Sequence, residues 1–307
     1  MKSCPFDVLG LGAVAVDDLI YVDAFPAPDR KVQVLDTARQ CGGLTATALV
    51  AAARLGARCA YAGTVGTDDL STFALDQLRQ ESIDLKYTRQ TRSARVFHSR
   101  IIVGKNSGTR NIFPDGRGVI GASAAWPPAT VIRGTRVLLV DHVGVRGMLR
   151  AAKIARRADI PIVGDLERDS GSGFAELFEF VDHLILSLEF AAHRTGCSDP
   201  ARALRRLWNS HRQTVIITDG PRGCWYADRA EPKGATHQPA FVVRAIDTTG
   251  CGDVFHGAYA AALAQGLPLA ERVQIATAAA ALKATQPGGQ SGIPNRKRLQ
   301  KFLTSSL

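Results

Sequence analysis

The chain has 307 residues, of which 46% are hydrophobic and 21% charged, and its formal net charge is +10. The length allows a sizeable core, and the composition excludes a wholly disordered chain and a collagen-like repeat. The basic residues are scattered and aromatic residues make up only 7% of the chain, so we expect no nucleic-acid partner, while anionic small molecules fit the positive charge equally well.

The first third of the chain predicts two strand and helix pairs, with strands over 6–11 and 59–65 and helices over 44–55 and 68–80. Short β-prone pieces lie outside these pairs, at residues 19–22, 31–37, 95–103 and 110–113. We interpret these pieces as a small separate sheet, built from roughly residues 17–40 and 93–115, that acts as a lid.

From residue 135 onward, strands and helices alternate regularly. The predicted strands cover 136–140, 161–164, 183–186, 214–218 and 241–245, with a hairpin through 224–226. The predicted helices cover 147–157, 174–181, 200–211, 254–265 and 269–285. This alternation predicts a mostly parallel sheet with helices on both faces, and ligands of such sheets bind beyond the carboxyl ends of the strands.

The most informative segment runs from Asp247 to Gly257, Asp-Thr-Thr-Gly-Cys-Gly-Asp-Val-Phe-His-Gly. A strand feeds a glycine-rich turn that opens a helix, so unpaired backbone N–H groups converge at the positive end of the helix dipole. Gly250 and Gly252 let a phosphate approach the backbone. Asp253 follows in the first helical turn, where its carboxylate can accept the proton of an attacking hydroxyl. A lone Gly-x-Gly-Asp is more often a helix cap, but the flanking residues favour the phosphate site.

A competing motif lies at residues 10–15, where Gly-Leu-Gly-Ala-Val-Ala fits the dinucleotide fingerprint of an oxidoreductase. That fingerprint requires a helix immediately afterwards. Here Val16, Asp17 and Asp18 lead into the β-prone piece 19–22, so the context disfavours nicotinamide chemistry.

At the segment beginning with Asp247, the sequence resembles the ribokinase-like carbohydrate kinases of the pfkB family, whose signature is D-T-x-G-A-G-D-x-F. Other segments look like landmarks of this family in the right order over nearly the whole chain: Gly10-Leu11-Gly12, Gly42-Gly43, Leu55-Gly56, the run from Gly63 to Asp68, and the run from Thr218 to Gly223. The resemblance implies one domain over residues 1–307 with a ribokinase-like α/β fold, in which helices flank a mostly parallel sheet beside a β-sheet lid. It also implies transfer of the γ-phosphoryl group of ATP to a sugar hydroxyl.

The resemblance assigns roles within the glycine-rich turn. Asp253 matches the catalytic base of the family, and the amides of Gly250, Cys251 and Gly252 match its anion hole. Cys251 replaces the usual Ala of the signature. A thiolate is favoured at a helix N-terminus, so we expect Cys251 to be reactive, with a small side chain that only fills the turn as the alternative.

The acceptor and the nucleotide are assigned by resemblance as well. Asp17 matches an Asp that binds substrate hydroxyls, although a surface carboxylate is the alternative, and Gly43 matches a glycine packed against the sugar. Thr47 occupies a position often held by a substrate-binding Asn. The residues that match the loop near the nucleotide are Thr218, Gly220 and Gly223.

Magnesium is expected with ATP, because phosphoryl transfer requires charge neutralisation. The family often carries N-x-x-E ahead of the nucleotide loop, whereas this chain has Ser-Leu-Glu-Phe at 187–190. The candidates for contacting the waters of magnesium, without binding the ion directly, are Asp165, Glu167 and Glu189. A potassium site of the family would fall near Asp247, Thr249 and the loop 284–291.

Among family members, the sequence looks most similar to sulfofructose kinases, through residues 238–241, 253–257 and 281–289. Lys31 falls where those enzymes place a Lys against the sulfonate. However, Val143 stands where they use an Arg, and their lid Asn matches Asn111 only in a shifted alignment. Losing a bidentate Arg removes discrimination for a tetrahedral anion, so the acceptor stays open between neutral and anionic sugars.

The compartment is predicted from what the sequence lacks. The six cysteines include no C-x-x-C pair, which argues against a zinc site or a disulfide framework and favours a reducing cytoplasm. Lys2 before the apolar run 8–16 imitates a signal peptide, but Pro5 and Asp7 interrupt it. No apolar run approaches the roughly 20 residues of a membrane-spanning helix, so we expect no membrane partner.

Taken together, these features predict an ATP-dependent kinase for a sugar or sugar derivative. A nucleoside kinase of the same superfamily and a sugar-binding relative without catalysis are the alternatives, and the intact Gly-Cys-Gly-Asp argues against the second. A homodimer through the lid is expected, because an exposed edge of short strands invites pairing.

Overall fold

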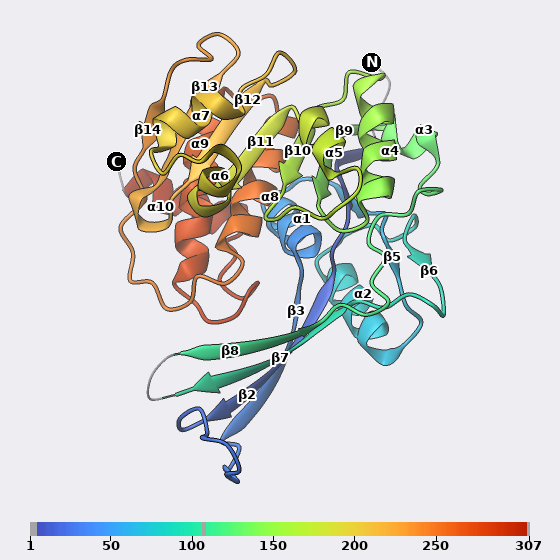
Figure 1. The fold of residues 1–307 in the computed structure, drawn as a ribbon, viewed down its shortest axis with the longest axis vertical. Coiled ribbons are helices and arrows are strands. Elements are labelled where there is room, and N and C mark those ends of the chain that lie inside the picture. The colour runs from blue at the N-terminus through green and yellow to red at the C-terminus, as the bar shows by residue number, and fades with distance from the viewer. Residues whose placement is uncertain (1–4, 106–108, 306–307) are drawn as a thin grey trace.

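The computed structural model describes residues 5–105 and 109–305. Its centre is an eight-stranded sheet (Figure 1). Six neighbouring strands run parallel, and two further strands are added at one edge by antiparallel pairing. In sheet order the strands are β14 (Thr236–Gln238), β13 (Cys224–Asp228), β12 (Thr214–Thr218), β11 (His183–Ser187), β10 (Ile162–Asp165), β9 (Thr135–Asp141), β1 (Phe6–Leu11) and β4 (Cys59–Tyr61).

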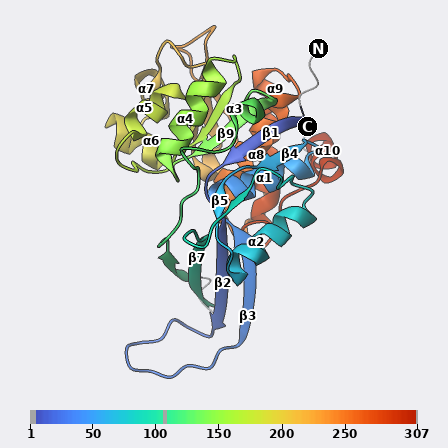
Figure 2. The same ribbon diagram turned by 90° about the vertical axis from the view of Figure 1, so that its right-hand side faces the viewer.

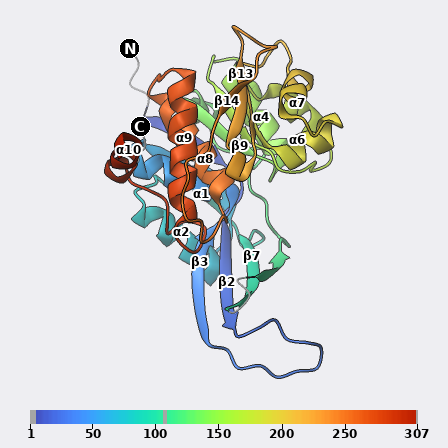
Figure 3. The ribbon, with the colours of Figure 1, turned by 90° about the vertical axis from the view of Figure 1, so that its left-hand side faces the viewer.

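Two helical layers cover the two faces of this sheet (Figure 3). Successive strand residues point to opposite faces, so Val137 and Leu139 join one hydrophobic cluster while Leu138 and Val140 join the other. Each such side chain stabilises the fold by about 1.5–3 kcal/mol when fully buried. The first cluster includes residues of α1 (Leu44–Arg54), α2 (Asp69–Gln80), α8 (Cys251–Ala264), α9 (Leu269–Ala284) and α10 (Arg296–Ser305). The second includes residues of α3 (Ala129–Ile132), α4 (Val145–Arg156), α5 (Phe174–Phe180), α6 (Leu188–Thr195) and α7 (Pro200–Leu207).

A separate four-stranded sheet forms a lid beside the main body (Figures 1 and 2). Its strands, in sheet order, are β3 (Asp36–Gly42), β2 (Ala15–Val22), β7 (Phe97–Gly104) and β8 (Arg110–Asp115). A small two-stranded sheet pairs β5 (Thr64–Val65), which follows β4 of the central sheet, with β6 (Arg89–Gln90), which precedes β7 of the lid. The predicted α/β architecture, with a mostly parallel sheet, flanking helices and a lid sheet, is confirmed.

Several predicted boundaries are wrong. Residues 241–245 form no strand but an irregular segment, and the helix predicted over 200–211 ends at Leu207 because Trp208 adopts an extended conformation. The strand expected over 31–37 begins only at Asp36.

Three helices were not predicted: α3, which has only four residues, α6 and α10. Helix α6 has clear local signals, because the Ser187 side chain accepts a hydrogen bond from the Phe190 amide at its start and Gly196 ends it in a left-handed conformation. Helix α10 buries only Leu299, so its apolar periodicity is weak. Within residues 5–105 and 109–305, no helix has both the length and the apolar character needed to cross a bilayer.

Candidate active site

The glycine-rich turn forms the start of α8, as its residue types require. Gly250 caps the helix in a left-handed conformation with φ of 76°, and a Cβ there would lie 2.8 Å from the carbonyl oxygen of Gly289. A Cβ on Gly252 would meet nothing within 4 Å. The turn therefore faces open space at Gly252, where a bound anion has room to approach the backbone.

The amides of this turn are not equivalent. The Cys251 amide donates to the carbonyl oxygen of Thr248 at 3.2 Å, so this predicted member of the anion hole is already engaged. Within the described ranges, the amides of Gly252 and Asp253 donate no hydrogen bond. First-turn amides are the donors that a helix leaves unsatisfied, and these two are free for an anion.

Asp253 belongs to a cluster of three carboxylates at the carboxyl end of β10. Oxygen atoms of Asp165, Glu167 and Asp253 all lie within 4.8 Å of one another. Burial raises the pKa of Asp253 well above its ordinary value, and the neighbouring carboxylates Asp165 and Glu167 raise it further. The arrangement therefore needs a proton or a cation close by.

The residues of this cluster fit magnesium. Oxygen ligands are those that Mg²⁺ prefers, and the buried Oδ2 of Asp165 has no hydrogen-bond partner in the described structure. Asp165 and Glu167 would hold the ion or its waters. Glu189, the third predicted candidate, is exposed in the first turn of α6 and is not part of this cluster.

A cavity of about 510 Å³ adjoins the turn and brings together the predicted nucleotide residues. Thr218 ends β12, Gly220 begins the short 3₁₀ turn that follows, and Gly223 comes directly after that turn. The cavity also contacts Cys251 and Gly252, and its apolar wall includes residues 241–243 and Ala245 of the segment wrongly predicted as a strand. A mostly apolar cleft next to unpaired amides suits a purine nucleotide with its phosphates.

The predicted acceptor residues lie at the base of the lid. Asp17 is half-buried in β2, and its Oδ2 lies 2.9 Å from where a Cβ of Gly42 would stand. Burial raises the pKa of Asp17, as does the nearby carboxylate of Asp18. Gly43 begins α1 with φ of 94°, and a Cβ there would lie 2.8 Å from the carbonyl oxygen of Ala13. Only glycine fits this position.

Thr47 does not take the place expected for a substrate-binding residue. Its side chain is buried, with 1% exposure, and its hydroxyl accepts a hydrogen bond from Gln290 at 3.2 Å. Its methyl group lies 3.4 Å from where a Cβ of Gly250 would stand. Thr47 therefore packs beneath the turn and supports it.

Lys31 and Asn111 both lie on the lid. Lys31 is exposed in the loop between β2 and β3, and this loop extends from the end of the lid remote from the central sheet (Figures 2 and 3). The structure therefore does not bring Lys31 to the carboxylate cluster within one chain. Asn111 is exposed on β8, opposite Ile102.

Asp247 is the most heavily bonded residue of the signature. Its Oδ1 accepts hydrogen bonds from the Thr249 amide at 2.8 Å, the Thr249 hydroxyl at 2.7 Å and the guanidinium of Arg110 at 2.8 Å. Its Oδ2 accepts one from the Gly288 amide at 2.8 Å. Burial alone would raise the pKa of Asp247, but these donors hold it well below the ordinary value.

Several contacts at the site were not predicted from the sequence. Arg110 of the lid contacts both Asp247 and Thr249, and Lys283 of α9 donates to the Asp247 carbonyl oxygen at 2.7 Å. An Arg among many and one Lys in an Ala-rich helix carry no distinctive spacing. The contacts arise from folding alone.

Asp141 and His256 were missed as well. Burial raises the pKa of Asp141 to about 6, although it accepts hydrogen bonds from two amides and the Thr45 hydroxyl. Its charge adds to that of the carboxylate cluster. His256 lies with Nδ1 2.8 Å from the Gly252 carbonyl oxygen and 3.4 Å from Asp165. Its position one turn after Gly252 was the signal available in the sequence.

Cys251 differs from the expectation of a favoured thiolate. Burial raises the pKa of its thiol, and the thiol donates to the Ala280 carbonyl oxygen at 3.5 Å. Burial therefore outweighs the effect of the helix N-terminus on the pKa of this thiol, while the reactivity of Cys251 stays a prediction.

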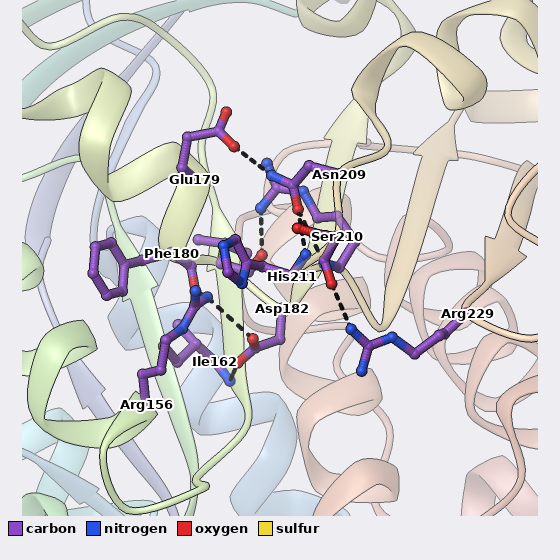
Figure 4. Close-up of polar contacts among 11 residues, drawn as sticks. Arg156, Ile162, Glu179, Phe180, Asp182, Asn209, Ser210, His211 and Arg229 are labelled. Carbon is purple, nitrogen blue, oxygen red and sulfur yellow. Dashed lines mark hydrogen bonds and ion pairs between the residues drawn. The ribbon is translucent and has the colours of Figure 1, made fainter.

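A second cavity, of about 550 Å³, lies at the amino ends of β10 to β12. There Asp182 accepts hydrogen bonds from the Ile162 amide at 3.0 Å and from Arg156 at 3.3 Å (Figure 4). Arg229 donates to the carbonyl oxygen of Ser210 nearby. Ligands of parallel sheets bind beyond the carboxyl ends, so we assign this network to structure and not to the active site.

Comparison with known proteins agrees with this geometry. The model of the pfkB family of carbohydrate kinases matches residues 7–296. A ribokinase of Haemophilus influenzae is 27% identical over 305 residues, covering 95% of this chain and 97% of that protein. A ribokinase of Mus musculus is 30% identical over 278 residues, covering 85% of this chain and 84% of that protein. The crystal structure of a ribokinase from Thermotoga maritima superposes with a TM-score of 0.83 at 25% identity, covering 97% of this chain and 99% of that one.

Proposed function

We propose that this chain, which belongs to the pfkB family of carbohydrate kinases and is an ATP-dependent kinase of sugar hydroxyls, uses Mg²⁺ and transfers the γ-phosphoryl group of ATP at a site formed by Asp253 and the turn at Gly252. One observation carries this proposal. The Asp253 carboxylate and two unpaired amides of the same helical turn lie beside the nucleotide cavity.

In this proposal, Asp253 accepts the proton of the acceptor hydroxyl as that oxygen attacks the γ-phosphorus of ATP. Its raised pKa, caused by burial and neighbouring carboxylates, makes it a stronger base than an exposed Asp. The amides of Gly252 and Asp253 donate to the oxygens of the transferred group, with Gly250 providing the left-handed turn that aims them. Magnesium held near Asp165 and Glu167 supplies neutralisation of phosphate charge.

The acceptor would lie at the base of the lid, between Asp17 and the turn. Asp17 is half-buried, so its carboxylate can accept hydrogen bonds from sugar hydroxyls, and Gly43 permits close approach to the backbone. Thr218, Gly220 and Gly223 would line the nucleotide. Closure of the lid would exclude water from the reacting groups.

We also propose that the chain dimerises through its lid. Six large apolar side chains are 40–51% exposed, all of them on the β2–β3 loop or on β8: Phe25, Val32, Val34, Leu35, Ile112 and Phe113. Exposed apolar clusters of this kind mark association sites. Two unpaired sheet edges, β3 and β8, accompany them.

Free thiols support a reducing cytoplasm as the compartment. The five cysteines within the described residues, Cys41, Cys59, Cys197, Cys224 and Cys251, are all free. A reducing compartment keeps thiols in that state.

Release of ADP over a panel of acceptors tests the proposal. The panel includes neutral sugars, sulfonated and acidic sugars, and nucleosides, with ATP and Mg²⁺ present throughout. We expect turnover with at least one sugar and its loss in Asp253→Asn. Turnover with nucleosides alone would replace the sugar assignment, and nucleotide binding without turnover on any acceptor would favour a binding protein that has lost catalysis.

A further inference from the structure

The oxygen atoms of Asp247 are already engaged by donors. Its carboxylate accepts four hydrogen bonds, three on Oδ1 and one on Oδ2. Its carbonyl oxygen accepts from the ammonium group of Lys283. The next carbonyl expected to face a cation, that of Ala284, accepts from the amides of Ile246 at 2.7 Å and Asp247 at 3.1 Å.

A potassium ion does not fit the oxygen atoms of Asp247 and Ala284. A monovalent metal would need lone pairs of these oxygens that are directed instead at N–H donors. It would also lie beside two positive side chains, the ammonium of Lys283 at 2.7 Å from the Asp247 carbonyl and the guanidinium of Arg110 at 2.8 Å from Oδ1. Like charges at such separations repel strongly in a partly buried site.

Lys283 is placed as a buried cation requires. The whole residue has 0% exposure, and a buried ammonium is tolerated only when paired and hydrogen-bonded. Asp247 supplies both the carbonyl acceptor and a negative charge nearby. A Cβ at Gly292 would lie 2.3 Å from the Lys283 carbonyl oxygen, so the backbone around Lys283 is closely packed too.

We propose that the ammonium of Lys283, assisted by the guanidinium of Arg110, is the resident cation of the Asp247 loop and replaces a monovalent metal. Lys283 is a positioning residue: it fixes the Asp247 carbonyl, and Asp247 in turn fixes Thr249 immediately before the anion-binding turn. Only the expected change in the KM for ATP rests on the proposed function. The cation site at Asp247 is defined by the contacts of Lys283 and Arg110.

The test compares potassium with tetramethylammonium, an ion too large for a carbonyl site, at constant ionic strength. For the unaltered protein we expect the KM for ATP and the melting temperature to be the same in both salts. The Lys283→Ala variant loses a charged hydrogen bond, so its KM for ATP in tetramethylammonium should rise about tenfold or more. Potassium should restore much of this loss and raise the melting temperature of that variant.

Lys301→Ala is the matched control, since Lys301 is exposed on α10; it should behave as the unaltered protein in both salts. A potassium-dependent KM or melting temperature in the unaltered protein would overturn the proposal. So would a folded Lys283→Ala whose KM and melting temperature ignore the salt and match the unaltered protein. If Lys283→Ala does not fold, the comparison of salts on the unaltered protein still decides. If no sugar is phosphorylated, the proposed function fails, while the melting temperatures continue to test the cation site.

Discussion

At the scale of single residues, two glycines of α8 have opposite surroundings. A Cβ on Gly252 would enter open space above the turn, whereas a Cβ on Gly257 would lie 1.9 Å from the carbonyl oxygen of Ala48 in α1. One glycine therefore serves the approach of a ligand, and the other serves helix packing.

We expect Gly252→Ala to lower turnover sharply while leaving stability unchanged or raised by about 0.5–1 kcal/mol, because Ala favours a helix over Gly. Gly257→Ala is the matched variant and should destabilise the fold by about 1–3 kcal/mol through overpacking. Denaturant unfolding and ADP release measured on both variants check this pair. Equal losses of stability in the two would contradict the assignment.

Asp253 combines a functional role with an unfavourable environment. The Asp253→Asn substitution should lower turnover by about 10²-fold or more, because it removes the acceptor of the hydroxyl proton. It should also keep or raise the melting temperature, since one of three closely spaced, mutually repelling carboxylates becomes neutral. Near-normal turnover in a folded variant would remove Asp253 from the reaction.

His183 links stability to pH. Burial, with Arg272 nearby, lowers its pKa to about 3 from an ordinary 6.5. Below pH 6.5 the unfolded chain binds a proton that the folded chain refuses, so the free energy of unfolding falls as the pH drops from 6.5 towards 3. We expect His183→Gln to flatten this slope by about 1 kcal/mol per pH unit. Urea unfolding between pH 6.5 and 4 measures this change in slope.

At the scale of elements, the lid is tied to the signature loop by one ion pair. Arg110 of β8 reaches Asp247 across 137 positions of sequence. The side chain of Arg110 is 39% exposed, so the pair is worth about 0–1 kcal/mol. It can hold the lid close without preventing its opening.

Arg110→Gln should therefore increase amide hydrogen exchange in β8 by a few-fold, as the lid detaches more often. Arg117→Gln provides the control, because the ion pair between Arg117 and Asp115 joins the end of β8 to the turn that follows it and does not involve Asp247. Exchange followed by mass spectrometry over residues 110–115 distinguishes the two variants. Identical exchange in both would show that the contact with Asp247 does not restrain the lid.

Helices and strands were predicted well where burial gives their apolar residues a regular spacing. They were predicted poorly where contacts with distant parts of the chain decide the local conformation. Helix α1 and the six parallel strands follow apolar patterns and glycine stops. The segment 241–245 is apolar except for Arg244, but its apolar residues form a wall of the nucleotide cavity instead of a strand. Its apolar residues line a ligand cavity. A local apolar pattern cannot distinguish residues that line a cavity from residues of a buried strand.

At the scale of the whole molecule, the exposed apolar side chains of the lid predict association. Phe113→Asp on β8 should convert a dimer to a monomer, because it buries a charge in the proposed interface. Ile120→Asp introduces the same charge at an exposed residue outside the lid strands and should leave the dimer intact. Light scattering coupled to size exclusion measures both. A monomeric unaltered protein at high concentration would contradict the proposal.

The amino-acid sequence by itself determined the alternation of strands and helices and the turn before α8, since both follow from local rules of burial and backbone freedom. The positions of Gly250, Gly252 and Asp253 were readable for that reason. Only the tertiary structure decided that Asp165, Glu167 and Asp253 converge, and that Arg110 and Lys283 meet at Asp247. These groups come from distant strands and helices, and their charges, burial and pKa values exist only once strand order and lid placement bring them together.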